Sequence, residues 1–478
     1  MKKYLSLYRT YKKDVLLPLF LLAGCGVMQV SCNKVLNALP DQAKVDGNAI
    51  VDQRSAEVAL NGAYYRFVNT GENYTTGLPA TRWANIHEQY PSSFAGNIIY
   101  YQGAYLGGEN DFTSENPYGE SMWVYYYTLV NAANGVIQGL EPLDASKIDP
   151  DRKKEILGEA RFLRGYAHYG LLSYFAEFWD MSSPYGIMLR KEPVTVSNIA
   201  QARSPVKDSY DFILADVDEA IANAPAVQVN YYASKWAAMA LKMRILINRG
   251  ADGDYEEVIR LADAILTEGP YELEPDVVDL FRTKGLSSKE VILGTKAYAN
   301  QISEIEAYYY RNASQYYSRD SLTSYLENDP RKDWMITVVG TDNTFTKYTG
   351  ALAETKYAFR LTEVYLLKAE AIVRSGGSIN DAKAIVKEIM SHAGVTDFSA
   401  IDGATDADRL LIEINKEFAR NLVAEDGADW FSLLRLPFET VKKIKPTIAE
   451  KTRYISAVPL SEHEKNPAFG EQNPGYGW

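Results

Sequence analysis

Aromatic side chains gather in two segments that lack helical periodicity, and they are the residues of this chain best suited to binding chemistry. In residues 69–118 these aromatics include Trp83, Tyr90, Phe94, Tyr100, Tyr101 and Tyr105. In residues 270–360 they include Tyr308, Tyr309, Tyr310, Tyr316, Tyr317 and Trp334. Amide and guanidinium groups lie close by in the sequence: Arg82, Asn85, Asn97, Gln102, Arg311, Asn312 and Gln315. An aromatic plane can stack on the apolar C–H face of a sugar ring, while amides and guanidinium groups bond its hydroxyls.

This pattern predicts a ligand platform built from both segments. The candidate ligand-binding residues are Trp83, Asn85, Tyr100, Tyr101, Tyr309, Tyr310, Tyr316 and Trp334. The competing interpretation is that the aromatics pack the loops onto the body of the protein, which is the commoner role for any single one. Loop segments of this length are unusual in a compact domain unless they serve a function.

Motifs that would indicate catalysis are absent from the sequence. There is no G-x-S-x-G elbow, no P-loop, no H-E-x-x-H and no C-x-x-C. The four histidines are scattered along the chain: His87, His168, His392 and His463. His168 lies within a helical pattern, where we expect it to pack, and Asp320, Asp329 and Asp333 lack the spacing of a calcium loop. No two acidic residues are marked out as a catalytic pair, although the many carboxylates leave a glycosidase-type pair open. The prediction is a protein that is not an enzyme and has no cofactor; no metal ligands are assigned, and the sequence leaves open whether a metal binds.

The N-terminus has the pattern of a bacterial lipoprotein export signal, so residues 1–31 are predicted to be a signal peptide. Five basic residues precede an apolar run at 15–24, and both cysteines of the chain follow. Leu22-Ala23-Gly24-Cys25 is the better lipid-attachment box in isolation, and Ser31-Cys32 is the weaker one. The apolar stretch is shorter than the roughly 20 residues that a membrane-spanning helix needs. A lipid on either cysteine would tether the mature chain to a membrane surface.

Charge argues against nucleic acid as a partner. The chain has 50 Lys and Arg against 62 Asp and Glu, a net charge of −12. Residues 1–31 carry +4, which leaves the mature chain near −16 (−12 − 4). Proteins that bind nucleic acids present basic surfaces to the phosphates, and this chain is acidic.

Helical periodicity covers most of the remaining chain, so the fold is predicted to be mostly α. Helices are expected at 55–68, 121–140, 151–178, 207–224, 232–249, 254–267, 361–375, 379–393, 405–424 and 428–436. Successive antiparallel pairs suggest degenerate tetratricopeptide-like hairpins, because no clean 34-residue repeat is present. The helical scaffold is thus 55–68, 121–178, 207–268 and 361–436, and the loop-rich face is 69–118 and 270–360. Short strands are expected at 291–295 and 334–339, and a turn at 473–476.

Four stretches of the chain together resemble the SusD/RagB family of Bacteroidetes outer-membrane lipoproteins. They are residues 158–180 (GEARFLRGYAHYGLLSYFAEFWD), 359–371 (FRLTEVYLLKAEA), 414–435 (INKEFARNLVAEDGADWFSLLR) and the tail 455–476, which ends in QNPGY. The chain departs from the family where Lys416-Glu417 stands for the usual Glu-Arg, where Val458-Pro459 stands for Ile-Pro, and where Ala428 follows the glycine instead of Arg. The helical motifs have core spacing, so we expect them to be framework, with Arg161 and Arg164 bonding nearby carbonyls or carboxylates.

The resemblance implies a single SusD-like domain over residues 32–478, mostly α, with tetratricopeptide-like hairpins and a loop-rich, irregular ligand-binding face. It implies a cell-surface lipoprotein of the outer membrane that binds oligo- or polysaccharide and delivers it to a SusC-like TonB-dependent transporter. Peptide uptake, as in RagB-like members, is the alternative. Ligand residues in this family come from variable loops, so the resemblance does not say which residues bind. The residues after Cys32 fit the usual start of the family, which favours Cys32 over Cys25 as the lipid attachment site.

Overall fold

The computed structural model describes residues 49–68, 83–100, 110–296, 316–352 and 355–478, with only the backbone of residues 71–72, 79–81, 84–85 and 302–303. Contacts divide the chain into Met1–Ala49 and Ile50–Trp478, and the second unit holds nearly all of the described structure. The leader with Cys25 and Cys32 lies outside the described residues. Three of the candidate binding residues also lie outside them: Tyr101, Tyr309 and Tyr310.

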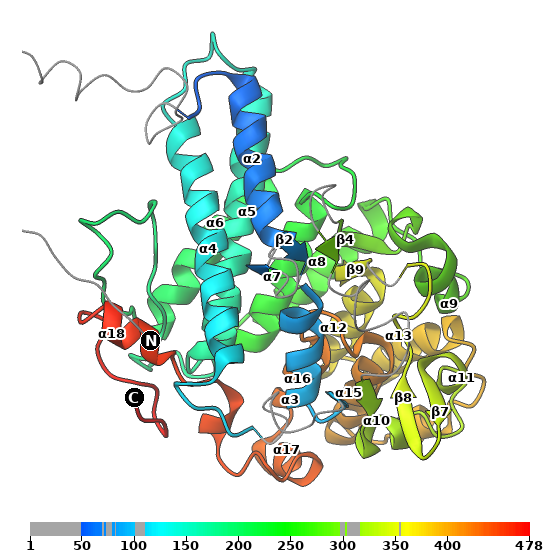
Figure 1. Cartoon of the computed structure of the whole chain (residues 1–478). Coiled ribbons are helices and arrows are strands. Elements are labelled where there is room, and N and C mark those ends of the chain that lie inside the picture. Colours follow the sequence, from blue (N-terminus) through cyan, green and yellow to red (C-terminus); the bar gives the residue numbers. More distant parts are fainter. Residues whose placement is uncertain are drawn as a thin grey trace, which may run out of the picture. The chain divides into compact units, whose positions relative to one another are not determined.

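Long helices form most of the described chain, as the periodicity predicts. They are α2 (Gln53–Val68), α4 (Pro117–Leu140), α5 (Pro150–Phe175), α6 (Val206–Asn223), α7 (Lys235–Arg249), α8 (Asp254–Glu268), α12 (Leu361–Arg374), α13 (Ile379–His392), α15 (Ala407–Leu422) and α16 (Ala428–Leu434). Each of the helices α4 to α8 packs against the next, and α12 packs against α13 (Figure 1). These successive pairs make a tetratricopeptide-like scaffold, which confirms the predicted fold class.

Helix α5 lies at the centre of this scaffold. From Gly158 to Phe175 nearly every side chain is buried, so neighbouring helices cover α5 on all sides. Gly170 permits one of these contacts, because a Cβ atom there would lie 2.4 Å from the ring of Tyr126 on α4. His168 packs as expected: it is fully buried beside Phe212, and burial lowers its pKa to about 3.

Helix α4 begins at Pro117, inside the segment that composition marks as loop, because a polar cap and a proline start it. The side chain of Asn116 accepts hydrogen bonds from the N–H groups of Tyr118 and Gly119 at 2.9 and 3.3 Å. A proline in the first turn is favourable, since its missing N–H would have no partner in the helix anyway. Asp149 caps α5 in the same way, ahead of its own first-turn proline.

Short strands occur where the helical period is lost. They are β1 (Gly71–Glu72), β2 (Pro79–Thr81), β3 (Ile98–Tyr100), β4 (Val291–Thr295), β5 (Ile302–Ser303), β6 (Tyr316–Ser318), β7 (Ile336–Val339), β8 (Asp342–Phe345) and β9 (Lys356–Arg360). The strand predicted at 291–295 is confirmed as β4. The one predicted at 334–339 is shorter than expected, because Trp334 and Met335 end helix α11 and the chain becomes extended only at Ile336. The strands pair in the orders β1-β2-β5, β3-β6-β8-β7 and β4-β9.

Shorter helical turns connect these elements. They are η1 (Ala84–Gln89), α3 (Tyr90–Phe94), α9 (Val277–Asp279), η3 (Leu280–Lys284), η4 (Gly285–Ser287), α10 (Asp320–Tyr325), α11 (Lys332–Met335), α14 (Ser399–Asp402), α17 (Phe438–Ile444), η6 (Lys451–Tyr454) and α18 (Leu460–Lys465). The predicted tail turn is confirmed: the N–H of Tyr476 donates to the carbonyl of Asn473 at 3.2 Å, and Gly475 has φ +83°. Among the described helices, none combines the length and the apolar character needed to cross a membrane.

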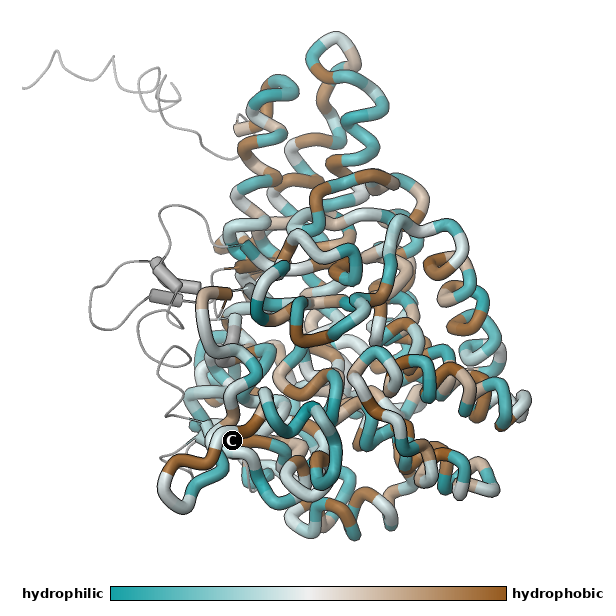
Figure 2. The backbone as a smooth tube through the Cα atoms, turned by 90° about the vertical axis from the view of Figure 1, so that its right-hand side faces the viewer, coloured by the Kyte–Doolittle hydropathy of each residue, from teal (hydrophilic) through white to brown (hydrophobic). Residues whose placement is uncertain are grey.

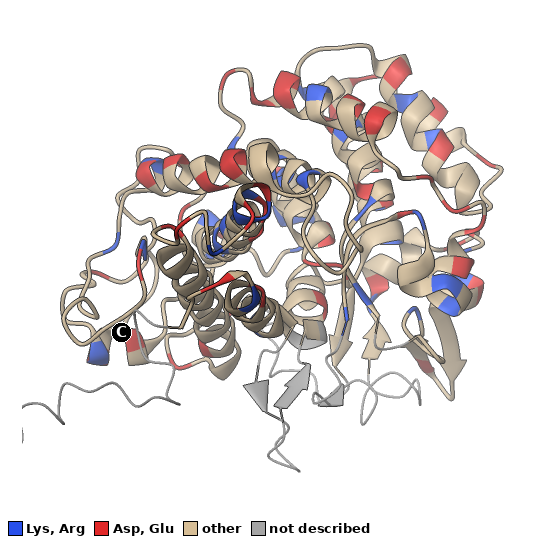
Figure 3. Cartoon of the chain, turned by 90° about the horizontal axis from the view of Figure 1, so that it is seen from above, with Lys and Arg blue, Asp and Glu red and all other residues tan. Residues whose placement is uncertain are grey.

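Two apolar clusters form the core. The larger one joins the scaffold helices, and the smaller one lies beneath the loop-rich part, where it includes Ile98, Phe281, Tyr316 and Phe345. Figure 2 shows apolar and polar residues alternating along the helices, which is the pattern of helices buried on one side. Figure 3 shows Lys and Arg interspersed with Asp and Glu over the helices.

Candidate ligand-binding face

Strand pairing joins the two aromatic segments, although they are about 200 residues apart in the sequence. Strand β3 of the first segment pairs antiparallel with β6 of the second, with Ile98 opposite Ser318 and Tyr100 opposite Tyr316. The rings of Tyr100 and Tyr316 lie 5.5 Å apart at 44°. A second connection lies nearby in sequence, where β2 pairs in parallel with β5. The structure therefore brings two of the candidate residues together in one sheet.

The two faces of the β3–β6 pair differ in exposure. Residues directly opposite in an antiparallel pair share a face, so Ile98, Ser318, Tyr100 and Tyr316 lie on one side. Tyr316 is only 2 % exposed and belongs to the smaller apolar cluster. Tyr317 points to the opposite side and is half-buried. A strand predicted at residues 316–318 would have assigned Tyr316 and Tyr317 to opposite faces, because successive side chains of a strand alternate.

Trp83 is 1 % exposed and packs in the core next to α2. Its ring stacks on the imidazole of His87 at 4.0 Å and 24° and meets the edge of Phe67 at 6.0 Å. A ligand does not reach a ring in this position, so Trp83 is a packing residue and the prediction that it binds the ligand is not supported. Asn85 follows in the π-helix η1, where only its backbone is described.

Trp334 is half-buried at the end of α11. Its ring stacks on Phe281 at 5.4 Å and 29°, and the guanidinium of Arg282 lies 5.6 Å from the ring centre. Arg282 also donates to the Trp334 carbonyl at 3.1 Å. Trp334 thus holds the loop-rich part together while keeping part of its surface open to solvent.

A groove of about 740 Å³ opens beside strand β4 in the loop-rich part of the described structure. Its walls come from the α6–α7 connection, from residues 270–271 and 284–296, and from Leu352 and Thr355. Asn230 fixes one wall, because its amide donates to the Leu286 carbonyl and its own carbonyl accepts from Gly294, both at 2.7 Å. Two half-buried tyrosines, Tyr231 and Tyr271, line the groove. Sequence reasoning missed both, since Tyr231 lies beside a turn between two helices and Tyr271 lies at the very start of the second aromatic segment, far from its run of tyrosines.

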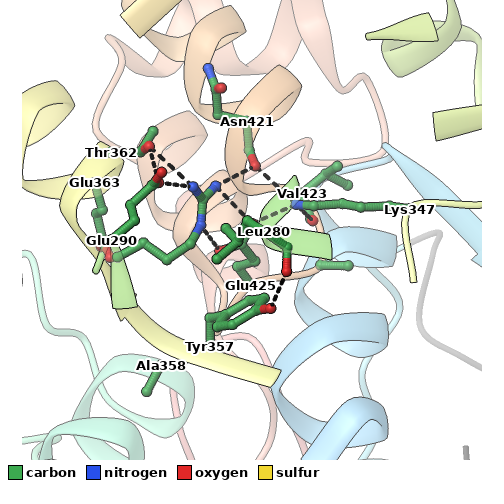
Figure 4. A network of polar contacts seen from close by, with 12 residues as sticks. Leu280, Glu290, Lys347, Tyr357, Ala358, Thr362, Glu363, Asn421, Val423 and Glu425 are labelled. Atoms are coloured by element: carbon green, nitrogen blue, oxygen red, sulfur yellow. Dashed lines mark hydrogen bonds and ion pairs between the residues drawn. The ribbon is translucent and has the colours of Figure 1, made fainter. Parts of the chain in front are cut away.

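A buried ionic cluster, here called the junction, lies where β9 meets the turn between α15 and α16 (Figure 4). Arg360 donates to Glu425 at 2.6 and 3.0 Å, and it also pairs with Glu290. Lys347 donates to the same Glu425 at 2.5 Å and to the Val423 carbonyl at 2.8 Å. All of these charged groups are nearly inaccessible to solvent, and burial lowers the pKa of Lys347 to about 8.

The next residue of the same turn extends the junction to the scaffold. Asp426 accepts from Tyr166 of α5 at 2.8 Å and from Arg244 of α7 at 2.5 Å. It also contacts His87 of the first aromatic segment, with 2.8 Å between Oδ1 and Nδ1. Burial lowers the pKa of His87. One buried carboxylate therefore holds two scaffold helices and η1 in a fixed arrangement.

Helix η1 is attached to strand β9 by a further buried pair. The carboxylate of Glu88 lies 3.3 Å from the ammonium of Lys356, and both side chains are almost fully buried. Burial raises the pKa of Glu88 to about 7 and lowers that of Lys356 to about 8. This pair therefore links η1 of the first aromatic segment to strand β9 through buried side chains.

Residues 34–247 match a family described as starch-binding and associating with the outer membrane, and residues 248–472 match the SusD family model. The chain belongs to the SusD family. A curated SusD-like protein from Bacteroides ovatus is 23% identical over 179 residues, which is 36% of this chain and 31% of that protein's length.

Solved SusD structures share the fold over most of both chains. A SusD superfamily protein from Bacteroides thetaiotaomicron has a TM-score of 0.71 at 20% identity and covers 89% of this chain and 100% of its own. NanU from B. fragilis has a TM-score of 0.71 at 18% identity, covering 92% and 100%. A laminarin-binding SusD-like protein has a TM-score of 0.68 at 18% identity, covering 89% and 100%. At these identities the likeness establishes the fold.

The SusD helix motifs act as framework in this chain, as expected. Arg164 of α5 makes two bonds of 2.7 Å to Asp216 of α6, and Arg161 lies 3.5 Å from the same carboxylate. In the motif around α16, buried Asp429 accepts from Ser92 and Asn97 at 2.9 and 2.8 Å. Asn97 directly precedes β3, so this carboxylate positions the strand that carries Tyr100. The sequence pattern identified these motif residues but not their partners.

Proposed function

We propose that this chain is a cell-surface lipoprotein of the outer membrane that binds oligo- or polysaccharide and delivers it to a SusC-like TonB-dependent transporter. The observation that carries the proposal is the pairing of β3 with β6, which places aromatic side chains from both loop segments in one sheet on a SusD scaffold. The laminarin-binding relative of the same fold supports a carbohydrate ligand.

Capture would use stacking and hydrogen bonding without chemical change. Tyr317 lies on the less buried face of the β3–β6 pair and would be the aromatic group to meet a sugar ring. Tyr100 lies on the other face beside Tyr316, where it would support the sheet from below. Such contacts require a platform that does not shift on binding. The junction supplies this rigidity, since its charged groups bond the strands and the scaffold at once.

The attachment to the membrane is part of the same proposal. Removal of residues 1–31 would leave Cys32 at the new N-terminus, with Cys25 as the alternative site. A lipid there would keep the binding face beside the transporter. Mass spectrometry of the N-terminal peptide from membrane-extracted protein identifies the modified cysteine directly.

Calorimetry with a panel of purified polysaccharides and peptides tests the function. The proposal predicts binding of at least one glycan, and loss of most of that affinity in Tyr317→Ala. The matched control is Tyr185→Ala, because Tyr185 is also half-buried but lies in the connection between α5 and α6, outside both aromatic segments, with its hydroxyl donating to Glu471 at 3.1 Å. A panel in which only peptides bind would replace the glycan proposal with the RagB-like alternative. Turnover of any glycan by the homogeneous protein would contradict the non-catalytic role.

A further inference from the structure

The groove beside β4 has an unusual charge for this protein. Three of its lining residues are lysines, Lys284, Lys289 and Lys296, and none of the lining side chains is a carboxylate. The whole chain has more acidic than basic residues, 62 against 50. A basic lining within an acidic protein favours a negatively charged ligand.

The three lysines are not equivalent. Lys284 is paired with Glu274 and is also influenced by Asp279, and Lys289 lies 2.8 Å from Glu272. The Lys289–Glu272 pair is exposed on both sides, and such pairs contribute little, so an anion from a ligand can compete for the lysine.

Lys296 differs, because within the described chain no carboxylate lies within 4.0 Å of its ammonium, which sits 4.8 Å from the centre of the Tyr231 ring. Lys296 and Tyr231 are held in place by the same connection. Lys296 directly follows strand β4, and the N–H of Gly294 in that strand donates to the carbonyl of Asn230, the residue before Tyr231. Behind Tyr231, the ring of Tyr232 packs on Tyr64 at 4.6 Å, and its hydroxyl donates to Asn61 at 2.7 Å. The backbone that carries Lys296 and Tyr231 is therefore fixed on both sides, and the exposed Lys296 side chain extends from it at the edge of the groove.

We propose that this groove binds an acidic sugar unit of the glycan, with Lys296 pairing with its carboxylate or sulfate group. The proposal rests on the proposed function, because it names the class of saccharide that such a protein would capture. Tyr231 and Tyr271 offer hydroxyl and ring surface to the sugar, and Asn230 forms part of the same wall. Lys284 and Lys289 extend the positive rim for further acidic units.

The test compares acidic and neutral polymers on the full mature chain. The carboxylated probes are polygalacturonate and alginate, the sulfated probe is dextran sulfate, and the neutral probes are dextran, laminarin and xylan. The key variant is Lys296→Gln, which removes the charge and keeps much of the stem. Lys207→Gln is the matched control, because Lys207 is an exposed lysine on α6 outside the groove. Thermal unfolding followed by circular dichroism verifies that both variants are folded.

We expect at least one acidic polymer to bind more tightly than the neutral ones. Lys296→Gln should weaken that binding about three- to tenfold, the range expected for one ion pair at a partly open site. Lys207→Gln should leave it unchanged, and the carboxylated and sulfated probes show which anion is preferred. Equal or tighter binding of neutral polymers, or equal effects of the two variants, would overturn the groove assignment but leave the glycan function intact. Failure of every glycan in the wider panel would instead contradict the proposed function itself.

Discussion

The junction makes a quantitative prediction for Glu425→Gln. The substitution keeps the shape of the side chain but removes the charge that Arg360 and Lys347 share. Glu290 remains beside Arg360, whereas Lys347 keeps only uncharged carbonyl partners. Breaking a buried ion pair by removing one partner costs about 3–5 kcal/mol, because the remaining charge is left uncompensated. Lys347 already has a pKa of about 8, so it can lose its proton in the variant, and we expect a cost near the lower end of that range.

Urea unfolding at pH 7, followed by tryptophan fluorescence, measures this change in the free energy of unfolding. Glu272→Gln is the matched control, because Glu272 pairs with Lys289 at the surface and its loss should cost less than about 1 kcal/mol. A loss below about 1 kcal/mol in Glu425→Gln, or equal losses in the two variants, would contradict the conclusion that the junction holds the loop-rich part to the scaffold.

Four further predictions follow from the buried contacts. Trp83→Ala should lower the free energy of unfolding by about 3–5 kcal/mol in the same urea assay, since it empties a core position. Gly427→Ala should lower the melting temperature, because φ is +75° and the new Cβ would lie 2.4 Å from the Tyr174 hydroxyl. Asp429→Ala should weaken glycan affinity in calorimetry, with a stability cost of about 1–3 kcal/mol from the unpaired amide and hydroxyl. Because the pKa of Glu88 is raised to about 7, its contribution to stability is present below about pH 4.5 and is lost as the pH rises to about 7. In Glu88→Gln the free energy of unfolding, measured with urea, should therefore vary less with pH over that range.

The scaffold could be predicted from sequence because amphipathic periodicity is a local signal. Helices α8 and α13 begin and end within a residue of their predicted limits. Polar caps were harder to place, and Asn116 with Pro117 was assigned to a loop although this pair starts α4. The packing role of His168 was also predictable, because its neighbours in the helix repeat at core spacing.

The binding face could be predicted only in outline. The aromatic content identified the two loop segments. Nothing in the sequence indicates that β3 of the first segment pairs with β6 of the second. Without that register, Tyr316 cannot be assigned to the buried face of the strand pair and Tyr317 to the half-buried one. Trp83 was a reasonable binding candidate by residue type, and only the contacts with His87 and Phe67 place it in the core.

The buried charges were beyond prediction for a different reason. Glu425 and Asp426 look like ordinary surface residues in a sequence with 62 acidic side chains. Their partners come from distant segments, such as Arg360 and Arg244, and only the folded chain brings them together. Long-range ion pairs of this kind leave no spacing pattern in the sequence.

Hydrogen–deuterium exchange of the mature chain, with and without a saturating glycan from the binding panel, tests the central claim most directly. The account predicts that the glycan slows exchange in the loop-rich face, including β3 and β6, and leaves the scaffold helices α4 and α6 unchanged. Protection confined to those scaffold helices, with none in β3, β6 or the groove beside β4, would contradict it.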